Sequence, residues 1–156
     1  MSKQESKVID GVRPHLAAGE EPLVAIVAQP KGTTKAAAGA GALGAAGSML
    51  GGGERRAAHD AAAGVGLVLA SPCALVLTSQ RLLTVKIGAP IGLGLGGKVK
   101  EVLSSVPLAD VAGIEVKKVA LRQNVTLHVR GESIHLEANG AASAKALAAT
   151  FSTLGH

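Results

Sequence analysis

Aromatic residues are nearly absent from this sequence. Phe151 is the only one among 156 residues, which include no Trp or Tyr. The core must therefore be filled by Leu, Val, Ile and Ala, with Gly where two backbones come close. With almost no aromatic side chains, the protein lacks a surface on which nucleic-acid bases could stack. The 16 basic residues, against 11 acidic ones, are spread along the chain and form no basic patch in the sequence. Nucleic acid is therefore not an expected partner.

Disulfide-forming cysteines and a leading apolar segment are also lacking. Cys73 has no second cysteine to pair with, so an internal disulfide is excluded. The sequence is therefore compatible with a protein that works in a reducing compartment. Residues 1–7 are charged and lead into no apolar run, so no secretory signal is predicted. We therefore expect a cytoplasmic protein.

Recognisable catalytic motifs are missing as well. No Ser, His and acidic residue fall into a triad pattern, and Cys73 lies in an apolar stretch where a thiol is usually inert packing. Two glycine patterns, 39–44 and 92–98, match phosphate-binding loops, but Val99 stands where the second pattern needs Ser or Thr, and a strand is expected to follow. We predict linkers at both places, no cofactor and no enzymatic activity.

A mostly β pattern with a helix near each end is present instead. Apolar residues recur at helical spacing at both ends of the chain, and short apolar or alternating runs fill most of the space between them. In chain order, a single domain over residues 1–156 is predicted to contain an N-terminal helix within 1–19, a buried strand at 23–28, an Ala/Gly-rich insertion at 31–65, strands between 73 and 138 and a C-terminal helix at 141–154.

The helices and the insertion carry more detailed expectations. The first helix covers about residues 4–18, and Pro14 kinks it or ends it early. Glycine's entropic cost argues against a stable isolated helix in the insertion, which is either disordered or a loose helix docked on the rest. Asn139 is the predicted N-cap of the last helix. The apolar stripe of that helix consists of Ala144, Leu147, Ala148, Phe151 and Leu154.

Two short apolar strands around residues 79–80 are predicted to form a hairpin. With those two residues in the loop, Leu77 faces Leu82 and Val76 faces Leu83. Both faces of this hairpin are then apolar, so both need a cover. The second cover is the N-terminal helix, the Ala/Gly insertion or another subunit.

A second hairpin is predicted further along the chain, with Gly131 and Glu132 as a two-residue type II′ turn. This register places His128 opposite His135 on the solvent face, with Glu137 on the same face. Directly opposed residues have Cβ atoms about 4.5–5.5 Å apart, so the two imidazoles could share a metal ion or repel each other when protonated. Two ligands make a weak metal site, so an ordinary solvent-facing pair is favoured.

The stretch 61–80 is free of charged residues and is long enough to cross a bilayer as a helix. Pro72 interrupts it, and its second half fits the first hairpin, so we do not expect it to span a membrane. Peripheral membrane contact through the Ala/Gly-rich tract is left open.

The run Leu-Val-Leu-Thr-Ser-Gln-Arg-Leu-Leu at 75–83 resembles the Leu-Thr-x-x-Arg-Leu-Leu hairpin of bacterial pleckstrin-homology-like (PH-like) domains. Leu-Ala-Ala-Gly-Glu at 16–20, Val-Pro-Leu-Ala-Asp-Val at 106–111, the later Val-Thr-Leu-His-Val segment and the closing helix look like the same family. The similarity covers residues 16–154 apart from the insertion and is that of an actinobacterial-type member. It implies a mainly β (α+β) fold, a curved antiparallel sheet or partly open barrel capped by the C-terminal helix, with Phe151 as the plug.

The resemblance implies little about function beyond self-association into rings, which is ascribed to some members. From the doubly apolar hairpin and the exposed edge of a sheet, we predict a non-catalytic interaction or scaffolding module that self-associates or binds a protein or peptide. The alternative is a peripheral, membrane-associated module that binds anionic lipid or phosphate. Its candidate contacts are Lys98, Lys100, Lys117, Lys118 and Arg122.

Overall fold

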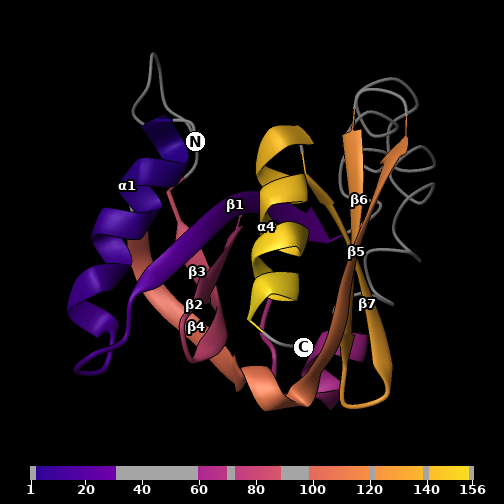
Figure 1. Ribbon diagram of the computed structural model, residues 1–156, viewed down its shortest axis with the longest axis horizontal. Coiled ribbons are helices and arrows are strands. Elements are labelled where there is room, and N and C mark those ends of the chain that lie inside the picture. The colour runs from indigo at the N-terminus through magenta and orange to yellow at the C-terminus, as the bar shows by residue number, and fades with distance from the viewer. Residues whose placement is uncertain are drawn as a thin grey trace, which may run out of the picture.

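Seven antiparallel strands form one bent sheet in the order β4-β3-β2-β1-β7-β6-β5 (Figure 1). The computed structural model describes residues 3–30, 60–69, 73–88, 99–119, 122–138 and 141–154. The elements are α1 (Lys3–Val12), a 3₁₀ turn (Arg13–His15), β1 (Pro22–Pro30), β2 (Cys73–Thr78), β3 (Arg81–Ile87), β4 (Val99–Pro107), a second 3₁₀ turn (Leu108–Asp110), β5 (Val111–Val119), β6 (Arg122–Val129), β7 (Glu132–Ala138) and α4 (Ala141–Thr153). Because β4 and β5 are the two ends of this order and do not pair with each other, the sheet does not close into a barrel.

The N-terminal helix ends early, as its proline indicates. α1 stops at Val12, and Pro14 lies at the start of the 3₁₀ turn that follows, where its missing N–H costs no helical hydrogen bond. The buried apolar side chains of α1 are Val8, Ile9 and Val12, which share one face of the helix. This face packs on the sheet and makes α1 amphipathic.

The first hairpin has the predicted register and is covered on both faces within the chain. Leu77 pairs with Leu82 and Val76 with Leu83. Val76 and Leu83 belong to a cluster with the apolar face of α1, whereas Leu77 and Leu82 belong to the larger core on the opposite face of the sheet. Of the three covers that the sequence allows, the N-terminal helix therefore supplies the second one.

The C-terminal helix fills the larger core. Figure 1 shows α4 between the arm formed by β1–β4 and the arm formed by β5–β7, and it contacts β1, β5 and β6. Of the predicted stripe, Ala144, Leu147 and Phe151 are buried and Leu154 packs against the same core, whereas Ala148 is only half-buried. A single aromatic ring, that of Phe151, thus lies in a core that is otherwise aliphatic.

The predicted register of the second hairpin is wrong. The turn consists of Arg130 and Gly131, not of Gly131 and Glu132, and both of its residues have positive φ, 50° and 83°. Positive φ at both central positions is the requirement of a type I′ turn, which suits the twist of the strands. Because the turn begins one residue earlier, each residue of β6 pairs with a β7 residue two positions away from the predicted one. A shift of two positions keeps every side chain on the same face, so the apolar face is as predicted although every cross-strand pair differs.

Contacts from outside the hairpin hold Arg130 in this conformation. Its guanidinium Nε and Nη2 donate to Oδ2 of Asp110, at 3.0 and 2.7 Å, and its Nη1 donates to the carbonyl of Val65 at 3.0 Å. Its backbone N–H also donates to the carbonyl of Asp110 at 3.1 Å. These bonds offset the cost of about 1 kcal/mol that an L-residue meets in the left-handed region.

The described end of the Ala/Gly-rich tract is part of the core. Residues 60–64 are helical, and Ala62, Val65, Leu67 and Leu69 are buried in the larger cluster. The N–H of Val68 donates to Oγ of Ser104 on β4 at 2.9 Å. The segment 60–69 therefore links β4 to the β6–β7 turn. Residues 31–59, the loop 92–98 and the predicted cap Asn139 lie outside the described residues.

Candidate functional site

The three described lysines among the predicted anion contacts lie on opposite edge strands. Lys100 is exposed on β4, whereas Lys117 and Lys118 are exposed and adjacent near the end of β5. Lys98 and the side chain of Arg122 are outside the described residues. Lys117 and Lys118 are therefore neighbours in the chain but point to opposite faces of the sheet, and Lys100 lies on the other edge.

The histidines predicted to face each other do not. His128 pairs with Ser133 and His135 with Thr126, because the turn begins one residue earlier than predicted. The ring of His128 contacts Oγ of Ser133 and Oε2 of Glu115, each at 3.0 Å, and Nδ1 of His135 lies 3.1 Å from Oγ1 of Thr126. Each imidazole is thus bonded to its own neighbours on the outer face of β5, β6 and β7.

A shared metal ion between these histidines loses its geometric basis. Glu137, predicted to lie beside them facing solvent, is 3% exposed and is paired with Gln29 of β1 across the neighbouring ladder. In the described part of the chain, no cluster of three or more His, Cys, Asp or Glu side chains could hold a metal ion. Cys73 is buried at the start of β2.

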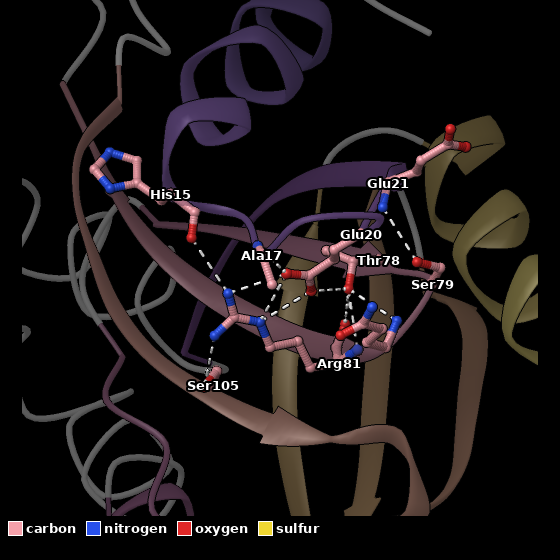
Figure 2. A network of polar contacts seen from close by, with 9 residues as sticks. His15, Ala17, Glu20, Glu21, Thr78, Ser79, Arg81 and Ser105 are labelled. Carbon is pink, nitrogen blue, oxygen red and sulfur yellow. Dashed lines mark hydrogen bonds and ion pairs between the residues drawn. The ribbon is translucent and has the colours of Figure 1, made fainter.

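A buried carboxylate joins the N-terminal segment to the first hairpin (Figure 2). The side chain of Glu20 is 0% exposed, and it accepts hydrogen bonds from Nε of Arg81 at 2.9 Å, from Oγ1 of Thr78 at 2.5 Å and from the N–H of Ala17 at 3.0 Å. Thr78 Oγ1 also accepts from the N–H of Arg81 at 3.0 Å, which shapes the β2–β3 turn. The Thr and Arg of the Leu-Thr-x-x-Arg-Leu-Leu run thus hold one carboxylate between them.

The same arginine reaches two further segments. Its Nη2 donates to the carbonyl of His15 at 3.3 Å, and its Nη1 donates to Oγ of Ser105 on β4 at 3.4 Å. Beside it, Glu21 and Ser79 exchange two bonds, from Ser79 N–H to the Glu21 carbonyl at 2.9 Å and from Glu21 N–H to Ser79 Oγ at 3.1 Å. One guanidinium therefore joins the 3₁₀ turn after α1, the β2–β3 turn and β4.

The electrostatics of this cluster favour an ionised carboxylate. Burial alone would raise the pKa of Glu20, but the hydrogen bonds from Arg81, Thr78 and Ala17 and the nearby positive charge outweigh it and lower the pKa from 4.5 to about 2. A catalytic acid or base needs a pKa near the working pH, and this carboxylate is moved away from it. The Glu20–Arg81 cluster therefore acts as a structural lock.

The edges of β4 and β5 have no neighbouring strand in the part of the chain that the structure describes. Of the two edge strands, β4 is interrupted, because its pairing with β3 shifts register between Thr84 and Val85 and again between Lys86 and Ile87. Bulges of this kind obstruct the addition of another strand. Ser104 of β4 also accepts a hydrogen bond from the N–H of Val68 through its Oγ. The β4 edge is therefore a poor docking site.

The β5 edge is regular. Its pairing with β6 is unbroken from Gly113 opposite His128 to Val119 opposite Arg122, and within the described residues no strand pairs with its other side. Along this stretch Glu115 and Lys117 are exposed, whereas Val116 is half-buried against the larger core. The place of this strand at the edge follows from the strand order and not from its own residue pattern.

No protein-family model matches the sequence, and no curated protein matches it. The relationship to PH-like domains is thus a proposal that rests on the quoted sequence segments and on the arrangement of the strands and helices. The described residues contain no helix long and apolar enough to cross a membrane. The second half of the uncharged stretch 61–80 forms β2 instead.

Proposed function

We propose that this chain is a non-catalytic interaction module of the PH-like kind, which self-associates through the free edge of its sheet. The PH-like part of the proposal is supported by the open seven-stranded sheet, by α4 within its bend and by the Thr and Arg that the quoted hairpin shares with that family. The interaction part is carried by one observation: β5 presents an edge that is regular from Gly113 to Val119 and that no other described strand covers.

A second strand can bind such an edge through main-chain hydrogen bonds. Half of the N–H and C=O groups of an edge strand point away from its neighbour, and strand addition satisfies them. The doubly apolar hairpin, which first suggested self-association, does not contribute, since α1 covers its second face. Val68 is the only large apolar side chain that is exposed in the described residues, at 51%, so the proposal rests on the edge rather than on an apolar patch.

The test is the mass of the purified protein in solution over a wide range of concentrations. Sedimentation equilibrium is expected to show a mass that rises above that of one chain and returns to it on dilution. Because main-chain hydrogen bonds carry the contact, the association should persist at high salt. A single-chain mass at every concentration would refute the proposal.

The alternative, binding of anionic lipid or phosphate, is favoured only by the exposed neighbours Lys117 and Lys118. Two lysines near an anionic surface contribute about 1 kcal/mol each, so the binding would be weak and sensitive to salt. Sedimentation with vesicles that contain anionic lipid tests it, with neutral vesicles as the control. Binding that is absent, or unchanged by salt, eliminates this alternative.

A further inference from the structure

We infer that the partner at the β5 edge is a second copy of this chain, whose own β5 pairs with it antiparallel and centred on Val116. The inference rests on the proposed function, and it adds the partner and the register. It requires that the edge be self-complementary, so that each residue finds a suitable neighbour when the strand meets its own copy around a two-fold axis.

The regular part of the strand is centred on the same residue. Pairing with β6 shifts register between Val111 and Gly113 and is continuous from Gly113 to Val119. The midpoint of this stretch is Val116, so a copy centred there meets the regular stretch along its whole length. A copy centred nearer Val111 would meet the irregularity, where the strand bends.

The charges select the same register. Glu115 and Lys117 are two residues apart, so they share one face of the strand, and directly opposite residues of an antiparallel pair also share a face. Centring on Val116 places Glu115 of each copy opposite Lys117 of the other, which makes two pairs of opposite charge. On the other face, Val116 meets its own copy and the stem of Lys118 covers Ile114, as lysine stems commonly do on apolar surface.

The neighbouring registers lack this complementarity. Centring on Glu115 places two carboxylates opposite each other, and centring on Lys117 places two ammonium groups opposite each other, which is destabilising in both cases. Registers centred between two residues would bring a solvent-facing side chain against a core-facing one. Glu115 is 74% exposed although it contacts His128, so a second copy can reach it.

Charge reversal tests the register. Glu115→Lys and Lys117→Glu each create two like-charged pairs and should raise the dissociation constant on the order of tenfold. The double variant restores opposite charges, as does a mixture of the two single variants, which should form a mixed dimer. Lys100→Glu is the matched control, because it makes the same charge change at an exposed lysine of β4, on the opposite edge of the sheet. His128→Gln shows whether losing the intrachain contact of Glu115 matters.

Cross-linking gives an independent reading. With Val116→Cys, the two thiols lie directly opposite and an oxidant should join two chains, whereas Cys73 is buried and stays unreactive. With Lys118→Cys, the two thiols lie four residues apart along the pair, about 13 Å, which is beyond the reach of a disulfide. Circular dichroism verifies that each variant is folded.

The outcomes separate the two proposals. Rescue by the mixture together with cross-linking at position 116 supports the register. If the native chain self-associates but the charge variants bind equally well and position 116 does not cross-link, this inference fails and the proposed function stands. If the native chain is a monomer at every concentration, the proposed function fails and the inference fails with it.

Discussion

Replacing Glu20 with Gln removes the charge at the centre of the structural lock. The side chain is 0% exposed, and its partner Arg81 is 31% exposed. The contacts lower the pKa of Glu20 from 4.5 to about 2, which corresponds to at most ~3 kcal/mol of stability. Since solvent partly screens Arg81, we expect Glu20→Gln to lower the free energy of unfolding by about 2 kcal/mol at neutral pH.

The pH dependence identifies the cause of this loss. The folded state holds the carboxylate ionised more strongly than the unfolded state does, so its contribution is present above pH 4.5 and disappears as the pH falls toward 2. Urea unfolding followed by circular dichroism should therefore show native and variant protein converging over that window. Glu21→Gln is the matched control: it changes an exposed neighbouring glutamate and should alter stability by less than ~0.5 kcal/mol. A constant difference between native and Glu20→Gln protein over this window would refute the reasoning.

Three further substitutions test the packing by the same unfolding assay. Gly11→Ala places a Cβ 2.6 Å from Cγ2 of Val99. Although alanine has the better helix propensity, we expect this contact to lower the free energy of unfolding by about 1 kcal/mol, and Val99→Ala should partly restore it. A gain in stability would contradict this close approach. Arg130→Ala should be less stable than Arg130→Gly by about 1 kcal/mol, because both variants lose the guanidinium contacts but only Gly adopts positive φ freely. Equal stabilities of the two variants would argue against the type I′ turn. Phe151→Ala should lower the free energy of unfolding by about 3–5 kcal/mol and Phe151→Leu by less than ~1.5 kcal/mol. A small loss for Phe151→Ala would contradict its place in the larger core.

The first hairpin shows what local pattern can predict. Its loop, register and two apolar faces all follow from residues within one short stretch, and the structure confirms them. The early end of α1 follows equally from the local effect of Pro14. Where the physical determinants are neighbours in sequence, the prediction from the sequence is correct.

The second hairpin shows where local pattern fails. A turn at 130–131 and one at 131–132 expose the same face, so alternation of apolar and polar residues cannot distinguish them. The distinction comes from Asp110 and Val65, which hold the guanidinium of Arg130 from 20 and 65 residues away. Periodicity contains no information on such contacts.

The candidate site was only partly predictable for the same reason. The alternation of charged and apolar residues along β5 is visible in the sequence. Whether this strand can bind a partner depends on its being last in the strand order, which the alternation does not determine. Glu20 and Arg81 were both noticed as parts of a family resemblance, yet their direct contact spans 61 residues and appears only in the fold. Both the Glu20–Arg81 contact and the position of β5 at the edge depend on how the fold arranges distant segments of the chain.

The measurement that tests the central claim most directly is amide hydrogen exchange of β5 at low and high protein concentration. Outward N–H groups of an edge strand have no partner within the described chain and exchange readily, unless a second strand binds them. The account predicts that protection within residues 113–119 rises with concentration, while protection of β4 does not. Exchange of β5 that is the same at all concentrations, or a rise confined to β4, would contradict it.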